Sequence, residues 1–163
     1  MTYDVIASYN LQAADLANRY DQPSLLASYQ PVEALIVARN KEALVLDIGA
    51  GGGRDAQWLK SMGYNVVAVE PSSGMRGEGE RRHSGEGIRW LDDRLPGLQR
   101  VHGLGLSFDL ILLSAVWQHV APQDRQRAFR KMSVLLKPGG LLLMTLRQGP
   151  AEASRVFRRL LSV

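Results

Sequence analysis

The sequence predicts an α/β fold in which a doubly wound, mostly parallel sheet of about five strands is flanked by helices and preceded by N-terminal helices. Two observations predict it. Short apolar runs alternate with helical patterns between residues 43 and 147, and a glycine-rich turn joins the first apolar run to the next helical pattern. Ligands of such folds bind at the carboxyl ends of the strands. The functional residues are therefore expected at that edge of the sheet.

The 163 residues fit a single domain that buries its own core. Residues 1–40 are expected to form an N-terminal helical cap. Asp4–Tyr20 place apolar side chains on one helical stripe, and Pro31 opens a second helix that ends near Asn40. The sheet and its helices are expected to occupy residues 43–147.

The expected strands are short and mostly apolar. They are Leu44–Ile48, Asn65–Val69, Gly87–Leu91, Phe108–Ser114 and Leu141–Leu146. The helix after the first strand runs from about Arg54 to Met62, where Gly63 ends it. Ser72–Ser84 contains three glycines, so a helix there is expected to be weak. The helix before the fifth strand begins at Pro122.

The end of the chain, residues 151–163, is expected to form a C-terminal amphipathic helix. Val156, Leu160 and Leu161 are its apolar positions among several arginines. The fifth strand would then be an edge of the sheet, and an uncovered edge pairs readily with another chain. A homodimer through the strand-five edge, or a poorly ordered tail, is therefore expected.

Composition narrows the classes of function. The chain has no cysteine and three histidines far apart in sequence, so no metal is expected. No apolar run is long enough for a bilayer, and the N-terminus lacks the apolar core of a signal peptide, so a cytoplasmic protein without membrane contact is expected. The net charge of +4 comes from arginines without interleaved aromatic residues. We interpret them as solvated surface, with an anionic small substrate or RNA as the alternatives.

The strongest functional signal is LVLDIGAGGGRDAQWL, residues 44–59. An apolar run ends in Asp47, four glycines follow within six residues, and a helical pattern begins. A glycine turn lets a ligand approach the backbone, and a helix N-terminus offers unpaired N–H groups to anionic atoms. Gly49, Ala50, Gly51 and Gly53 are therefore candidate ligand-binding residues.

The order Asp-x-Gly-x-Gly-x-Gly resembles the first motif of the class I S-adenosylmethionine (SAM)-dependent methyltransferases, whose fold is Rossmann-like. Residues 108–120, FDLILLSAVWQHV, and residues 136–147, LKPGGLLLMTLR, resemble the fourth strand with its loop and the fifth strand with its turn in the small-molecule members. The resemblance covers about residues 43–147. It implies SAM as methyl donor, S-adenosylhomocysteine (SAH) as product and an unidentified small-molecule acceptor.

The resemblance implies a role for several residues toward SAM. Asp47 and the backbone carbonyl of Ser114 are expected near its ammonium group, and Glu70, at the end of the second strand, near its ribose hydroxyls. Asp92 or Asp93 is expected to accept from the adenine amino group, and we prefer Asp92 because it is nearer the strand. The cofactor set also includes Pro71 and, against the adenine face, Met75.

The loop Ser114–His119 is expected to line the pocket for the methyl acceptor. His119 is the candidate catalytic base because imidazole titrates near neutral pH, and a structural hydrogen bond is the alternative. Trp117, Tyr9 and Tyr20 are expected to line the same pocket, with simple core packing as the alternative. The Asn/Asp-Pro-Pro-aromatic motif of enzymes that methylate the amines of bases is absent from this loop, which argues against such acceptors.

Two other functions stay open. Gly51, Gly53 and Ala56 satisfy the G-x-G-x-x-A spacing of dinucleotide-binding folds, so an NAD(P)-binding oxidoreductase is one. Asp47 disfavours it, because a carboxylate sits badly beside a pyrophosphate. The other is a non-catalytic module that binds SAM or a protein partner. A full class I core has seven strands, and the sequence offers no final strand pair, so the chain is expected to be truncated or a reduced variant.

Overall fold

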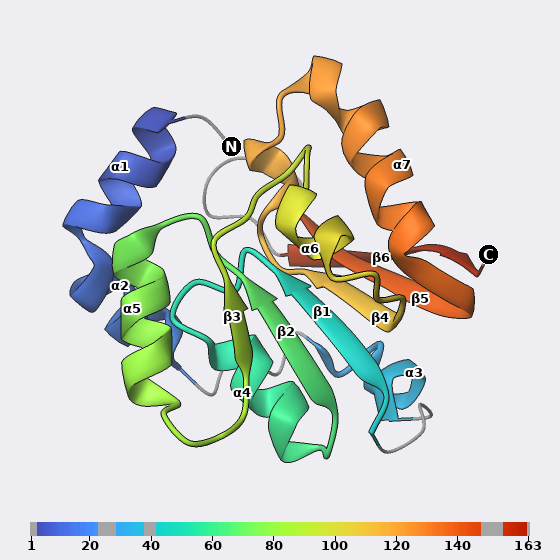
Figure 1. The fold of residues 1–163 in the computed structure, drawn as a ribbon, viewed down its shortest axis with the longest axis horizontal. Coiled ribbons are helices and arrows are strands. Elements are labelled where there is room, and N and C mark those ends of the chain that lie inside the picture. The colour runs from blue at the N-terminus through green and yellow to red at the C-terminus, as the bar shows by residue number, and fades with distance from the viewer. Residues whose placement is uncertain (1–2, 23–28, 38–41, 148–154, 163) are drawn as a thin grey trace.

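The structure is a computed structural model that describes residues 3–22, 29–37, 42–147 and 155–162. Its centre is a six-stranded sheet in the order β3-β2-β1-β4-β5-β6 (Figure 1). The strands are β1 (Leu44–Ile48), β2 (Asn65–Val69), β3 (Arg89–Leu91), β4 (Phe108–Leu113), β5 (Leu136–Arg147) and β6 (Arg155–Ser162). The pairs among β1–β5 are all parallel, as the sequence predicts.

Within the described residues the helices fall before and between these strands. They are α1 (Tyr3–Leu11), α2 (Ala13–Tyr20), α3 (Glu33–Val37), α4 (Arg54–Ser61), α5 (Ser73–Arg82), α6 (Gln99–Gly103) and α7 (Arg125–Leu135), with short 3-10 turns at Trp117–His119 and Pro122–Asp124. The predicted helix Asp4–Tyr20 is thus two helices that meet at Gln12. Residues 38–41, where the second predicted helix was expected to end, lie outside the described part.

Helices cover both faces of the sheet. Neighbouring residues of a strand point to opposite sides, so each strand contributes to the apolar core on both faces. Leu46 of β1 belongs to the apolar cluster that includes α6 and α7, whereas Val45 belongs to the cluster that includes α3 and α4. This arrangement confirms the doubly wound, Rossmann-like fold. The cap helices α1 and α2 lie beside α5 at the β3 side of the molecule (Figure 1).

Helix α5 forms despite its glycines. Ser72 caps its N-terminus, with the hydroxyl accepting from the backbone N–H of Met75 at 3.2 Å. Two of the glycines allow close packing: a Cβ at Gly74 would lie 3.0 Å from the Cβ of Ala13, and one at Gly79 would collide with the ring of Trp90. Packing of the cap and of β3 against this helix therefore offsets its low helix propensity.

The predicted C-terminal helix is wrong over Arg155–Ser162, which form β6. This strand runs antiparallel to β5, with Val156 beside Leu146 and Phe157 beside Thr145. A short helix has little stability of its own, whereas the edge of β5 offers a row of unpaired N–H and C=O groups to β-prone residues. The edge of β5 is thus occupied, and the expected homodimer through it loses its basis. Residues 151–154 and 163 lie outside the described part.

None of the helices in the described ranges combines the length and apolar character needed to cross a membrane. The cytoplasmic location stays a prediction.

Candidate functional site

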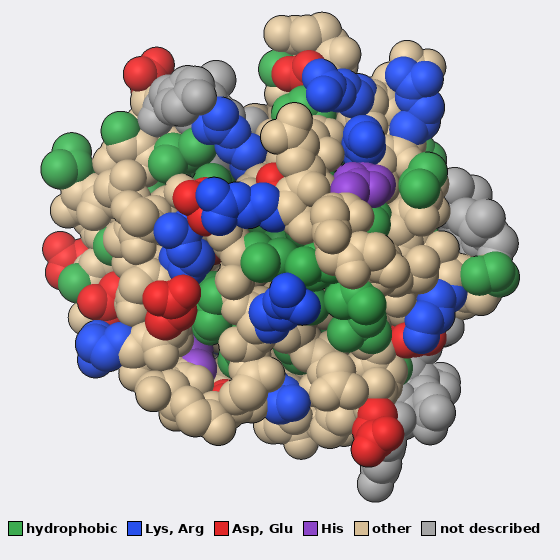
Figure 2. All heavy atoms as spheres, viewed as in Figure 1, with side chains coloured by type: hydrophobic (Ala, Val, Ile, Leu, Met, Phe, Trp, Pro, Cys, Tyr) green, Lys and Arg blue, Asp and Glu red, His purple; other side chains and the backbone are tan. Residues whose placement is uncertain are grey.

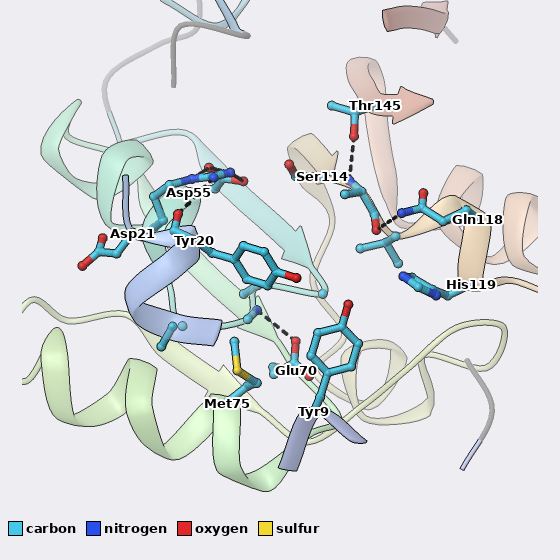
Figure 3. Close-up of a pocket in the computed structure, with 18 residues that line it drawn as sticks. Tyr9, Tyr20, Asp21, Asp55, Glu70, Met75, Ser114, Gln118, His119 and Thr145 are labelled. Carbon is cyan, nitrogen blue, oxygen red and sulfur yellow. Dashed lines mark hydrogen bonds and ion pairs between the residues drawn. The ribbon is translucent and has the colours of Figure 1, made fainter. Parts of the chain in front are cut away.

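A cavity of about 350 Å³ opens at the carboxyl ends of β1, β2 and β4 (Figure 3). This volume falls in the range of small-molecule sites. The cap forms one wall, the glycine loop after β1 the floor, and the loop after β4 the opposite wall. The lining residues are Tyr9, Ala17, Tyr20, Asp21, Gly49, Ala50, Gly51, Gly52, Arg54, Asp55, Glu70, Met75, Ser114, Ala115, Val116, Gln118, His119 and Thr145.

The glycine loop takes a backbone path that other residues rarely adopt. Gly49, Gly51 and Gly53 have φ angles of +75°, +58° and +93°. The N–H groups of Gly49 and Ala50 both donate to the carbonyl oxygen of Val69, at 2.7 and 3.0 Å, which ties the loop to the end of β2. Gly53 begins α4 without a side-chain cap. The first backbone N–H groups of this eight-residue helix have no partner within the helix, and its residues Arg54 and Asp55 line the cavity.

Glu70 closes the loop from the end of β2. Its Oε2 accepts from the backbone N–H of Gly51 at 2.9 Å, and its Oε1 accepts from that of Ser72 at 2.8 Å. The residue is buried, and this burial raises the pKa of its carboxyl above the usual value, against the lowering effect of the two N–H donors. Glu70 therefore holds a carboxylate at the cavity wall with lone pairs left for a ligand.

Asp47 lies behind the cavity wall. It is 1% exposed, and its Oδ2 is buried without a hydrogen-bond partner. Burial, with a further contribution from the charge of Asp55, raises its pKa well above the usual range. An unpartnered buried carboxylate oxygen is costly, and a cation nearby would relieve that cost.

A second carboxylate, Asp55, is neutralised inside the protein. Arg54 donates to it through Nε and Nη2 at 2.7 and 2.8 Å, and the hydroxyl of Tyr29 donates to its Oδ2 at 2.7 Å. Arg54 also donates through Nη1 to the carbonyl oxygen of Tyr20 at 3.1 Å, which anchors the end of α2. Sequence reasoning missed this network, although the Arg-Asp pair directly after the glycines was a signal for it.

The cap is fixed to the core around the cavity. The Oδ1 of Asn10 accepts from the hydroxyl of Ser72 at 2.7 Å and from the backbone N–H of Gly74 at 3.0 Å. The rings of Tyr9 and Tyr20 point into the cavity (Figure 3). Burial and the neighbouring Tyr20 raise the pKa of Tyr9 to about 12, so its hydroxyl stays protonated.

The loop after β4 forms the opposite wall. Ala115 has a φ of +56°, and its N–H donates to the hydroxyl of Thr145 at 2.6 Å. Gln118 donates to the carbonyl oxygen of Ala115 at 2.7 Å. His119 stands edge-on to Tyr9, with 6.3 Å between ring centroids, and burial lowers its pKa below the usual value. The imidazole is therefore neutral at neutral pH and able to accept a proton.

The cavity brings together most of the residues predicted from sequence. Those that line it are Tyr9, Tyr20, Gly49, Ala50, Gly51, Glu70, Met75, Ser114 and His119. Gly53 and Asp47 lie behind the lining. Trp117 packs instead against the apolar core and lies 5.9 Å beneath the guanidinium of Arg125.

The two predicted adenine acceptors lie outside the cavity lining. Asp93 accepts from the backbone N–H groups of Arg94 and Val101, at 2.8 and 3.0 Å, and so holds α6. Asp92 is half exposed, 3.7 Å from Arg76. Pro71 and Asp93 line a crevice of about 10 Å³ that shares Gly49, Val116 and His119 with the cavity. The adenine roles of these residues stay predictions.

No group of His, Cys, Asp and Glu side chains among the described residues could hold a metal ion.

Comparison with known proteins agrees with this architecture. Residues 46–144 match the family described as "Methyltransferase domain". A ubiquinone biosynthesis O-methyltransferase of Rhizobium etli is 32% identical over 108 residues, which are 66% of this chain and 42% of that protein. An uncharacterized methyltransferase of Alkaliphilus oremlandii is 28% identical over 110 residues, 64% of this chain and 45% of that protein. The chain thus spans less than half the length of these relatives.

Solved structures share the fold. The DhpI–SAH complex superposes with a TM-score of 0.66 at 17% identity, covering 97% of this chain and 78% of that one. An S-adenosylmethionine-dependent methyltransferase of Clostridium acetobutylicum gives 0.64 at 21% identity, over 88% of this chain and 57% of that one. The family match covers more than half of the sequence, including the glycine loop and the end of β2. This chain belongs to the methyltransferase domain family and shares its fold with the solved SAM-dependent methyltransferases.

Proposed function

We propose that this chain binds SAM in the cavity and transfers its methyl group to a small-molecule acceptor. The observation that carries the proposal is the hydrogen bond between the carboxylate of Glu70 and the backbone N–H of Gly51 at 2.9 Å. It sets an acidic acceptor beside a bare glycine backbone at the carboxyl edge of the sheet. That is the combination a ribose and an amino acid group require.

The charges of the cavity fit a cationic ligand. Among the described lining residues, Asp21, Asp55 and Glu70 are acidic and Arg54 is the basic one, and Arg54 is already paired with Asp55. The unpartnered buried oxygen of Asp47 lies behind the same wall. SAM has a sulfonium and an ammonium group, whereas a dinucleotide has a pyrophosphate. The family match and this charge balance both favour SAM over NAD(P).

Each part of the cofactor has a candidate partner. Glu70 would accept from the ribose hydroxyls, and Asp47 would act on the ammonium group through its charge, with the Ser114 carbonyl as direct acceptor. Backbone N–H groups at the start of α4 would donate to the carboxylate. Met75 would pack against the adenine inside the cavity.

SAM supplies a methyl group on a cationic sulfur that is reactive without further activation. The protein would orient the two substrates, exclude water from the site and provide a proton acceptor. His119 is held neutral by burial. One of its ring nitrogens, Nε2 or Nδ1, would take up the proton that the substrate loses on methylation. Tyr9 and Tyr20 line the cavity from the cap, where their rings would shield a bound methyl group from water.

The lining favours a small, uncharged acceptor. Because the described cavity offers no cation beyond the paired Arg54, an anionic acceptor would have no partner there. On the viewed face, Lys and Arg side chains lie in several separate groups rather than in one stripe (Figure 2). This supports solvated basic surface over an RNA-binding track.

Methyl transfer is tested with SAM labelled in its methyl group and a panel of phenols, catechols and amines, with SAH formation measured in parallel. The proposal predicts a labelled product from at least one uncharged acceptor, and its loss in Glu70→Ala. Carboxylated analogues of the same acceptor should react more slowly. SAH binding without transfer to any acceptor would support the non-catalytic alternative instead.

A further inference from the structure

His83 lies behind the glycine loop, outside the cavity. It follows α5 directly, and its side chain is one-tenth exposed. Its Nε2 lies 3.2 Å from the carbonyl oxygen of Gly52. Because a carbonyl oxygen can only accept, Nε2 must hold the proton and donate it. The other ring nitrogen, Nδ1, lies 3.5 Å from a carboxylate oxygen of Glu86, and this contact becomes an ion pair only when the ring carries a proton on both nitrogens.

The loop has no room to move toward His83. A Cβ added at Gly53 would lie 2.7 Å from Cδ2 of His83 and 3.0 Å from the ring of Trp90. On the cavity side, a Cβ at Gly52 would lie 3.0 Å from the Cβ of Ala17 in the cap. The peptide that joins Gly52 to Gly53 is thus enclosed between the α5 side and the cap.

The hydrogen bond from His83 fixes how this peptide is turned. On the cavity side, Gly51 is held by Glu70, and the N–H of Gly53 donates to the carbonyl oxygen of Ala50 at 2.9 Å. The carbonyl of Gly52 points the opposite way, where His83 is its partner. Without that donor the Gly52 carbonyl would lose its partner, and this peptide would be held only through the hydrogen bond from the N–H of Gly53 to Ala50.

We infer that His83 is a positioning residue for cofactor binding, which acts by holding the Gly52 carbonyl away from the cavity and so fixing the path of the glycine loop that lines it. The inference rests on the proposed function. His83 itself does not line the cavity, so it acts through the backbone and not on the ligand. The donated hydrogen bond sets the loop before the ligand arrives, and binding then costs less ordering of the loop.

The test compares variants that keep or lose the donor. His83→Phe keeps a ring without a donor, His83→Gln keeps an N–H at about the reach of Nε2, and His83→Asn holds its amide one methylene shorter. His102→Phe is the matched control, because His102 lies on α6 outside the cavity. For each variant, calorimetry gives the Kd of SAH and thermal unfolding gives the Tm.

We expect His83→Phe and His83→Asn to raise the Kd of SAH by roughly three- to tenfold, the effect of one lost hydrogen bond. His83→Gln and His102→Phe should stay within about twofold of the wild type, whatever their Tm. Should His83→Phe fail to fold, the comparison of Asn with Gln decides.

Equal affinity of the Asn and Gln variants would overturn the positioning role. A purely structural role would lower the Tm in every His83 variant without this pattern in Kd. Failure of the proposed function looks different, because the wild-type chain itself would then not bind SAH.

Discussion

The carboxylate of Glu70 and the backbone N–H of Gly51 are joined at 2.9 Å, which links the end of β2 to the glycine loop after β1. The same carboxylate accepts from the N–H of Ser72, whose hydroxyl donates to Asn10 in the cap. One acidic side chain thus connects the loop, the start of α5 and, through Ser72, the N-terminal helices. Its two roles, structural support and ligand acceptor, predict that its loss affects binding more than folding.

Glu70→Ala should weaken SAH binding by roughly 1–3 kcal/mol, because charge-assisted hydrogen bonds are lost and the Gly51 N–H is left without its partner. Glu80→Ala, at an exposed position of α5, is the control and should bind normally. Calorimetric titration of both variants measures the difference. Unchanged affinity in Glu70→Ala would remove this residue from the site.

Gly52→Ala should shift the cap by a few tenths of an ångström and weaken SAH binding, because the new Cβ would lie 3.0 Å from the Cβ of Ala17. Overpacking of this kind costs roughly 1–3 kcal/mol. The double variant Gly52→Ala, Ala17→Gly removes the opposing Cβ and should recover much of the lost SAH affinity.

Gly77→Ala is the control for that experiment. Its Cβ would meet nothing within 4 Å, and the substitution should stabilise α5 by roughly 0.5–1 kcal/mol. Denaturant unfolding and SAH titration of the variants check both effects. If the double variant binds no better than Gly52→Ala alone, the clash with Ala17 is not the cause.

Asp47→Asn should stabilise the ligand-free protein at neutral pH and weaken its affinity for SAH. Burial raises the folded-state pKa of Asp47 above its usual value of 3.8. The stability that this group contributes is therefore complete below pH 3.8 and is lost as the pH rises through the folded-state pKa.

The asparagine variant avoids that loss. Its free energy of unfolding should therefore exceed that of the wild type by more at pH 7 than near pH 4, by roughly 1–3 kcal/mol at pH 7. Denaturant unfolding at both pH values measures it, with Asp15→Asn, at an exposed position of α2, as the control. An advantage that does not change with pH would contradict a buried, unrelieved charge at Asp47.

His119→Gln should lower turnover while leaving the affinity for SAH nearly unchanged. Burial lowers the pKa of His119 below 6.5, so wild-type activity should fall only as the pH drops below that value. The same shift removes folding stability as the pH falls below 6.5, since the unfolded chain takes up the proton first. A pH–rate profile with the same acid limb in both proteins would show that another group is the base.

The sequence predicted the parts of the site that lie close together along the chain. The turn at Gly49–Gly53 and the acid at Glu70 follow from local patterns of glycine and strand ends. Tyr29 with Asp55, and His83 with Gly52, could not be predicted in this way because their partners are 26 and 31 residues apart. Only the packed fold brings them together.

Two further differences have the same cause. Residues 155–162 have the composition of an amphipathic helix, but the hydrogen-bonding edge of β5 makes them a strand. Asp93 looked like a ligand acceptor at a strand end, but it accepts from the backbone of α6 instead. For residues 155–162 and for Asp93, the partner is a backbone group elsewhere in the chain that would otherwise be unpaired, and the local sequence does not reveal it.

The most direct test of a SAM site is calorimetric titration of the purified chain with SAH, with NADH and NADPH titrated in parallel. A SAM site predicts saturable binding of SAH, weakened in Glu70→Ala, and no binding of either nicotinamide cofactor. Binding of NADH or NADPH without binding of SAH would contradict it.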